Sequence, residues 1–292
     1  MERVKTGIFG LDQLIEGGVV EKSVVVIIGS SGTGKSTFAM QFLQHGIENG
    51  EQGLYVTLEE PPEQILREAD MMNFNLRKHH EKDLFFIHLK GRNFKKMIEE
   101  QLPQLVKARS DYDIKTRVVI DPMTPLVWAD DDRLEQRELI GKLFYTLKDL
   151  GVVMATVEEH ARPGETMGED VLLPTYLSDG ALHLEYYPIG GAFNRTMKIL
   201  KMRGTHHGEG VYPYIFVRGV GVIIRASSSE MGGADEAGKS YDAVFEKALK
   251  SAEFAKAAPH ILSRIKGMKD SWDYAYSPEE ALQIMFETYG LK

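Results

Sequence analysis

The chain has 292 residues, no cysteine and a formal net charge of -8. This composition excludes a disulfide scaffold and a thiolate metal site, and the acidic balance argues against a protein dedicated to binding nucleic acid. No apolar run reaches the roughly 18 residues that a membrane-spanning helix needs, and the opening MERVKTGIFG lacks the apolar core of a secretory signal. We therefore expect a globular, cytoplasmic protein without a membrane segment.

Apolar runs of strand length alternate with helical patterns in the first part of the chain. The runs lie at residues 24–28, 54–58, 84–87, 118–120 and 152–157. Because they are almost wholly apolar, they are typical of parallel strands that are covered on both faces. The helical patterns lie at residues 37–49, 63–72, 94–109 and 133–150. This alternation predicts an α/β fold with a mostly parallel sheet flanked by helices.

The sequence pattern changes in the later part of the chain, where successive strand patterns replace the alternation of strands and helices. Further strand patterns lie at residues 181–186, 196–203, 214–217 and 221–225, and they predict an antiparallel edge of the same sheet. The intervening segment 160–178 is predicted to be a loop. We place the first domain at residues 1–225, a Ser/Gly/Ala-rich linker at 226–240 and a small helical appendage at 241–292.

The sequence GSSGTGKS at residues 29–36 fits the phosphate-loop pattern and lies between a strand pattern and a helix pattern. Its glycines let successive N–H groups point at one anion, and the helix N-terminus favours negative charge. Lys35 would act on the β- and γ-phosphates, and Ser36 would offer its hydroxyl to Mg²⁺. The predicted nucleotide-binding residues are Gly29, Ser30, Ser31, Gly32, Thr33, Gly34, Lys35, Ser36 and Thr37.

A second stretch, GADEAGKS at residues 233–240, fits the same pattern without its context. No apolar strand precedes it, and Asp235 and Glu236 would repel phosphate oxygens. We interpret this stretch as the end of the linker, followed by a helix that Ser240 caps. The sequence therefore predicts one phosphate site per chain.

Acidic residues follow two of the predicted strands. Asp121 ends the strand RVVID, where it would complete a magnesium shell; the alternative is a turn before Pro122. Glu59 and Glu60 follow YVTL, and a carboxylate there would orient and deprotonate the attacking water, or cap the next helix. Because adjacent strand residues point to opposite faces, we expect one glutamate to face the phosphate, and the sequence leaves open which.

This ordered set of motifs resembles the KaiC-like branch of RecA-fold ATPases, which also includes RadA-type recombinases. The set runs from TGIFGLDQLIEGGVVEKSVVVIIG through GSSGTGKS, YVTLEE and RVVID to LSDGALHL and KMRGTHH, over residues 6–225. The resemblance implies a RecA-like ATPase core that binds ATP and Mg²⁺ between the subunits of a ring, by analogy a hexamer. KaiC carries two such domains, whereas this chain has room for one, and the region after residue 240 lies outside the resemblance.

The motif KMRGTHH places Lys201 and Arg203 two residues apart on a predicted strand, so both project from one face. Alone, this is typical of a solvated strand face. By the resemblance, the pair would reach the ATP of the neighbouring subunit. Thr205 and His207 would then be further contacts to that nucleotide.

The resemblance leaves three uses of the nucleotide open. We favour a regulatory ring ATPase that signals through a protein partner, with autophosphorylation at Thr175 or Ser178 as a variant. A DNA-handling recombination accessory is disfavoured because the loop predicted at residues 160–178 holds more acidic than basic side chains. A nucleotide-sensing scaffold with little turnover is disfavoured by the presence of Glu59, Asp121 and the basic pair.

Overall fold

The computed structural model describes residues 2–89, 94–110, 114–129, 132–160, 168–186 and 195–224. The linker and appendage predicted after residue 225, together with the second phosphate-loop match, lie outside these ranges. Among the described residues, no helix combines the length and apolar character needed to cross a bilayer.

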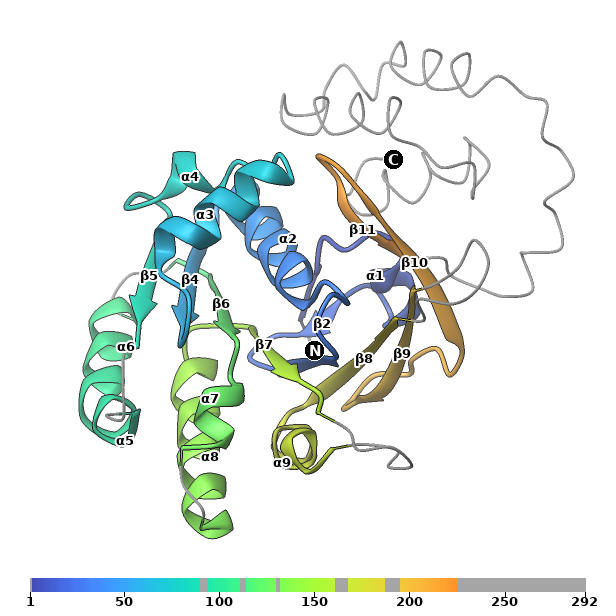
Figure 1. Cartoon of the computed structure of the whole chain (residues 1–292). Coiled ribbons are helices and arrows are strands. Elements are labelled where there is room, and N and C mark those ends of the chain that lie inside the picture. Colours follow the sequence, from blue (N-terminus) through green and yellow to red (C-terminus); the bar gives the residue numbers. More distant parts are fainter. Residues whose placement is uncertain are drawn as a thin grey trace, which may run out of the picture.

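A nine-stranded sheet forms the centre of the molecule, with the strand order β11-β10-β9-β8-β3-β7-β6-β4-β5 (Figure 1). The strands from β8 to β5 in this order run parallel, and β9, β10 and β11 add an antiparallel edge. The mostly parallel sheet with an antiparallel edge is therefore confirmed. The strands are β3 (Val24–Gly29), β4 (Gln52–Thr57), β5 (Leu84–His88), β6 (Thr116–Asp121), β7 (Val153–Glu158), β8 (Gly180–Tyr186), β9 (Arg195–Met202), β10 (Val211–Val217) and β11 (Gly221–Ile224).

Helices cover both faces of this sheet, as Figure 1 shows. One face carries α1 (Leu11–Leu14), α2 (Lys35–Glu48), α3 (Pro62–Met71) and α4 (Leu76–His79). The other face carries α5 (Phe94–Lys96), the π-helical turn η1 (Met97–Gln101), α6 (Leu102–Ser110), α7 (Thr124–Val127), α8 (Arg133–Lys148) and α9 (Glu169–Leu177). A short ribbon of β1 (Arg3–Val4) and β2 (Val19–Val20) lies beside the main sheet.

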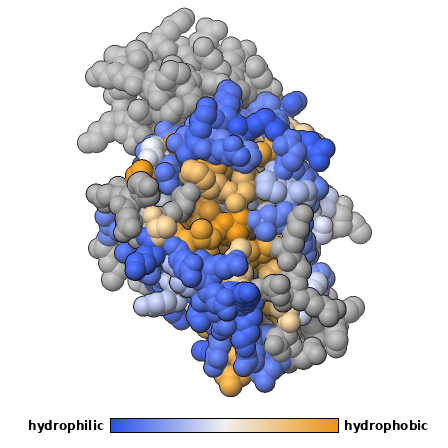
Figure 2. All heavy atoms as spheres, turned by 90° about the vertical axis from the view of Figure 1, so that its left-hand side faces the viewer, coloured by the Kyte–Doolittle hydropathy of each residue, from blue (hydrophilic) through white to orange (hydrophobic). Residues whose placement is uncertain are grey.

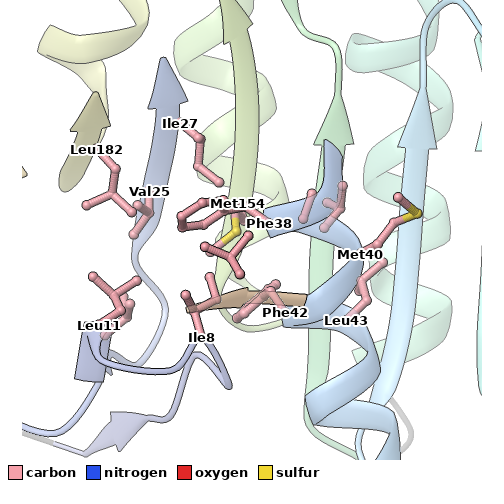
Figure 3. Close-up of a cluster of buried hydrophobic side chains, with 14 of the residues drawn as sticks. Ile8, Leu11, Val25, Ile27, Phe38, Met40, Phe42, Leu43, Met154 and Leu182 are labelled. Atoms are coloured by element: carbon pink, nitrogen blue, oxygen red, sulfur yellow. The ribbon is translucent and has the colours of Figure 1, made fainter. Parts of the chain in front are cut away.

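Alternate residues of the central strands supply two separate cores. Val25 and Ile27 of β3 pack with Phe38 and Phe42 of α2 on one face (Figure 3). Their neighbours Val24, Val26 and Ile28 enter the core under α8 on the other face. Since side chains of a strand alternate between faces, burial on both sides requires the continuous apolar runs seen in the sequence.

Helix α9 replaces part of the loop that was predicted at residues 160–178. Val171 is fully buried, and the helix packs on β3, β7 and α8. Gly168 precedes the helix and Pro174 lies inside it, so the local sequence favours a loop. Burial of the apolar side of the helix overrides that preference. The loop prediction is wrong for residues 169–177.

The sheet ends at β5, and an apolar groove of about 170 Å³ runs between this strand and α6. Figure 2 turns this side toward the viewer and shows apolar surface framed by hydrophilic residues. Phe85, Ile87 and Leu105 are among the side chains that line the groove. In the described part of the chain, no further strand pairs with β5.

A buried arginine joins α2 to the sheet. Arg117 of β6 donates from Nε to Glu51 Oε2 at 2.7 Å and from Nη1 to the carbonyl of Phe42 at 3.0 Å. Its guanidinium carbon lies 4.7 Å from the centre of the Phe42 ring. Gly46 of α2 leaves the space for this side chain, because a Cβ there would lie 2.2 Å from Arg117 Nε.

Two glycine-to-alanine substitutions test this packing. Gly46→Ala is expected to destabilise the protein by about 1–3 kcal/mol, since Arg117 is held by partners and cannot move away freely. Gly141→Ala in α8 has open space around it and is expected to stabilise by about 0.5–1 kcal/mol. Urea unfolding of the two variants and the parent protein measures both effects, and equal behaviour of the two variants would contradict the packing argument.

Candidate functional site

A cavity of about 390 Å³ lies where β3, β4, β6 and β7 end. These strands are parallel neighbours in the order β3-β7-β6-β4, so their carboxyl ends meet at one edge of the sheet. Such edges are where ligands bind in open α/β sheets. The cavity collects the phosphate loop after β3 and acidic residues that end or follow the other three strands.

The predicted phosphate loop forms one wall of the cavity. Its lining residues are Ser31, Gly32, Gly34, Lys35, Ser36 and Thr37, and α2 begins at Lys35. Gly29 ends β3, and Ser30 and Thr33 close the loop through a 2.8 Å bond from Thr33 Oγ1 to the Ser30 carbonyl. Lys35 Nζ donates to that same carbonyl at 3.0 Å. All nine predicted residues therefore either line the cavity or support the loop that does.

Side chains of strand β10 hold this loop in place. Tyr214 donates from its hydroxyl to the Thr33 carbonyl at 2.6 Å. The Phe216 ring lies against Gly34, which has a φ of 89°, and a Cβ there would come within 2.1 Å of the ring. Position 34 therefore requires glycine for two reasons, its left-handed backbone and the neighbouring ring.

Asp121 is buried at the end of β6 and faces the cavity. The Tyr55 hydroxyl donates to one carboxylate oxygen and the Thr156 hydroxyl donates to the other. Burial, followed by the charge of Asp121, raises the pKa of Tyr55 well above its usual value, so this donor stays protonated. The two hydroxyls fix the orientation of the carboxylate and leave it lone pairs for a further ligand.

Glu59 and Glu60 both line the cavity, which differs from the expectation that only one would face it. The strand alternation behind that expectation stops at Thr57, where β4 ends. Thr57 Oγ1 donates to the Glu60 carbonyl at 2.7 Å, and Gln64 Nε2 donates to the Glu60 carboxylate at 2.8 Å. Burial raises the pKa of both glutamates, with Glu158 and Asp121 adding to the rise at Glu59.

Glu158 belongs to the cavity although the sequence analysis did not select it. It ends β7, and its backbone N–H donates to Thr124 Oγ1 at 2.9 Å. The signal was present, since the run VVMATV is followed by paired glutamates just as YVTL is. On the side of α3, the cavity is lined by Ile65, Glu68 and Met72, with Phe216 from β10.

The cavity is strongly acidic within one chain. Among its described lining residues, five carboxylates face Lys35 as the one cationic side chain. Burial lowers the pKa of Lys35, while the nearby charge of Glu158, and then Asp121, opposes that fall. A polyphosphate would add further negative charge, so one chain alone is poorly balanced for binding it.

The predicted basic pair lies away from this cavity. Lys201 Nζ donates to the Thr175 carbonyl at 2.6 Å, and Arg203 Nη2 donates to the Tyr176 carbonyl at 3.4 Å. Lys201 in β9 and Arg203 directly after this strand thus both reach the carboxyl end of α9. Thr205 accepts a 3.0 Å bond from Arg3, and His207 Nδ1 lies 3.1 Å from the Gly208 carbonyl. None of the four is among the described residues that line the cavity of their own chain.

The two hydroxyls considered for autophosphorylation are engaged in local hydrogen bonds. Thr175 Oγ1 donates to the Val171 carbonyl at 2.6 Å within α9. Ser178 is fully buried, and its Oγ donates to the Thr175 carbonyl at 3.0 Å. The helix and the buried position differ from the open loop in which the sequence analysis placed them.

The chain is similar to a set of KaiC-like proteins. A family model described as "ATPase: KaiC" matches residues 4–229. A UPF0273 protein of Pyrococcus furiosus is 33% identical over 233 residues, which cover 73% of this chain and 90% of the relative. The circadian clock oscillator protein KaiC of Thermosynechococcus vestitus is 32% identical over 243 residues, which cover 76% of this chain and 44% of KaiC. The chain therefore spans less than half of KaiC.

The fold is similar to a solved structure as well. The crystal structure of a KaiC-like protein from Pyrococcus horikoshii OT3 aligns with a TM-score of 0.64 at 29% identity. The alignment covers 77% of this chain and 99% of that protein. The RecA-like α/β fold expected from the motifs is confirmed by this likeness and by the sheet order.

The acidic cluster gives a prediction about protonation. Glu158→Gln removes a like charge that faces Glu59, so the ionised form of Glu59 costs less free energy and its pKa is expected to fall. Half-titration of Glu59 should therefore move to lower pH, as measured by NMR of the side-chain carboxyl carbon. Glu135→Gln, which removes an exposed carboxylate paired with Lys95 at 2.6 Å, is the matched control. An unchanged Glu59 titration in Glu158→Gln would contradict the assigned contact.

Proposed function

Since the chain belongs to the family of KaiC-like, RecA-fold ATPases, we propose that it binds ATP with Mg²⁺ in this cavity and hydrolyses it to ADP and phosphate. The observation that carries the proposal is the meeting of the phosphate loop, Asp121 and the glutamate pair in one cavity of about 390 Å³. That volume lies within the range of small-molecule sites.

The cavity has a phosphate part and a nucleoside part. Residues 29–37 would bind the phosphates through backbone N–H groups, the uncapped start of α2 and the Lys35 ammonium. Ile65, Met72 and the Phe216 ring would hold the base, because they supply apolar surface beside the loop. In this arrangement the γ-phosphate would lie toward Asp121 and Glu59.

The residues present fit a magnesium ion that is shared with phosphates. Among the described residues, no group of three or more His, Cys, Asp or Glu side chains could hold a metal ion. Mg²⁺ is commonly held by one or two carboxylates together with substrate phosphates, and Asp121 and Ser36 are suitable ligands for that arrangement. When bound, the ion would neutralise phosphate charge. The Tyr55 and Thr156 hydroxyls would keep the Asp121 carboxylate in position.

Glu59 is the residue we assign as general base. Burial, followed by the nearby charges of Glu158 and Asp121, raises its pKa, and a raised pKa favours proton uptake by a general base. Glu60 is held by Gln64 at the start of α3, and Glu68 and then Asp121 add to the effect of burial on its pKa, so we infer that it lies closer to α3 than Glu59 does. In hydrolysis, Glu59 would take a proton from water as the water oxygen bonds to the γ-phosphorus. The bond from that phosphorus to the bridging oxygen breaks, and ADP leaves with this oxygen.

The basic pair would complete the site of a neighbouring copy. Lys201 and Arg203 do not reach the cavity of their own chain, whereas the acidic cavity needs additional positive charge to bind a polyphosphate. A head-to-tail ring, by analogy a hexamer, satisfies both conditions. Cations placed on the developing phosphate charge would then accelerate hydrolysis, with Thr205 and His207 near the same nucleotide.

Substitution of the proposed base separates chemistry from binding. Glu59→Gln keeps the size of the side chain but cannot accept the proton, so kcat is expected to fall by about 100- to 10,000-fold. ATP affinity, measured by isothermal titration calorimetry, should stay within about threefold because the phosphate loop is intact. Glu60→Gln is the matched comparison and should lose much less activity. A larger loss in Glu60→Gln than in Glu59→Gln would reverse the assignment.

Mixing two inactive variants tests whether the site is shared. Lys35→Ala disables the phosphate loop, and the double variant Lys201→Ala/Arg203→Ala lacks the basic pair, so each alone should lose about 1,000-fold in phosphate release. Random assembly of equal amounts makes about a quarter of the sites complete, and activity should return toward that fraction. Lys198→Ala, which removes a lysine of β9 paired with Glu185, serves as control. A mixture as inactive as its parts would contradict completion by a neighbour.

A further inference from the structure

Helix α9 connects the wall of the cavity to the basic pair of the same chain. Glu158, which lines the cavity, has its carboxylate 3.9 Å from His160 Nε2. His160 Nδ1 lies 3.5 Å from the carboxylate of Asp170, in the first turn of α9. The other end of α9 supplies the carbonyls that bind Lys201 and Arg203. A short series of contacts therefore links the nucleotide site of a chain to Lys201 and Arg203, the basic pair that the same chain would contribute to the site of a neighbouring copy.

Trp128 makes additional contacts at the start of α9, near the cavity. It follows α7 and donates from Nε1 to Asp170 Oδ1 at 3.0 Å. Its ring centre lies 5.2 Å from that of His160. The amide of Glu158 is bonded to Thr124 in α7, so α7 is tied to both the cavity wall and the start of α9. Asp170 thereby touches both residues that join α9 to the cavity.

The last turn of α9 binds the basic pair. Carbonyls at the C-terminus of a helix carry partial negative charge and lack partners within the helix, so they favour cationic side chains. Arg203 also lies 3.7 Å from Asp179, whose carboxylate accepts bonds from Lys148 Nζ and from the backbone of Val24, both at 2.9 Å. Val24 begins the strand that leads into the phosphate loop. Asp170 and the carbonyls that bind the basic pair belong to one helix of nine residues, so a displacement of its first turn would be passed to its last turn.

We propose that Asp170 is a positioning residue: through α9 it sets where Lys201 and Arg203 lie, and through His160 and Glu158 it makes their position depend on the nucleotide in the same chain. This inference rests on the proposed ATP hydrolysis and on the use of the basic pair at a neighbouring site. The γ-phosphate would enter beside Glu158, and the repulsion between these like charges would alter the contact of Glu158 with His160. The position of the basic pair at the neighbouring site would thus depend on whether ATP is bound in the chain that carries the pair.

A double-mutant cycle tests the positioning role. Asp170→Asn keeps an acceptor for Trp128 but loses the charge that faces His160, and it is expected to lower kcat about 3- to 30-fold with KM for ATP changed less than about twofold. In the Lys201→Ala/Arg203→Ala background the same substitution should have no further effect. Asp83→Asn removes the carboxylate from another Asp–His contact, with His79 at 2.9 Å, and should leave kcat unchanged. An equal loss in both backgrounds would show a general structural effect and overturn the proposal.

Tryptophan fluorescence provides a readout that does not need turnover. The chain has two tryptophans, so Trp272→Phe leaves Trp128 as the sole emitter. Binding of a non-hydrolysable ATP analogue with Mg²⁺ should change the Trp128 emission, and Glu158→Gln should remove that change. Calorimetry on the same samples measures binding: a bound analogue with no emission change overturns this inference alone, whereas no binding overturns the proposed function and this inference with it.

Discussion

Burial of the parallel sheet on both faces is the constraint on which the site depends. Strands covered by helices on either side cannot carry unpaired charges along their length, so ionisable side chains appear where the strands end. Four neighbouring parallel strands end at the same edge, and that edge receives the loop lysine, Asp121, Glu158 and the pair Glu59 and Glu60. The same helices that exclude water from the core therefore concentrate carboxylates in one cavity. The buried core contributes to this cavity as well. The hydroxyls of Tyr55 and Thr156 are both buried, and both donate to the carboxylate of Asp121 and orient it.

Local patterns predicted the parts of this architecture that depend on local interactions. The continuous apolar runs gave the central strands, and GSSGTGKS between a strand and a helix gave the phosphate loop and the start of α2. Asp132 directly precedes α8 and accepts bonds from the backbone N–H groups of Leu134 and Glu135, as an aspartate at this position commonly does. These features need only neighbours in the chain, and residue type and spacing report them well.

Features that depend on distant contacts were missed or mistaken. Helix α9 contains a proline and follows a glycine, and only the burial of Val171 against the sheet explains why it forms. The face that Glu60 presents depends on where β4 ends, which the alternation of strand residues cannot reveal. The contact between Gly34 and the Phe216 ring joins the loop to the antiparallel edge of the sheet, and no local pattern in either segment predicts it. Glu158 is a different case, because the run VVMATV followed by two glutamates repeats the pattern of YVTL and its glutamates.

The placement of the basic pair gives the proposed assembly a direction. The basic pair, Lys201 and Arg203, lies on a different surface of the chain from the cavity. A contact that joins the basic pair of one copy to the cavity of another therefore cannot be self-complementary. A contact of this kind has a donor side and an acceptor side, and repetition of it closes into a ring or continues as an open helix according to the rotation between successive copies. In an open arrangement one terminal subunit would have an incomplete site and the other an unused basic pair. Closure would give every copy both roles, so the number of working sites would equal the number of chains.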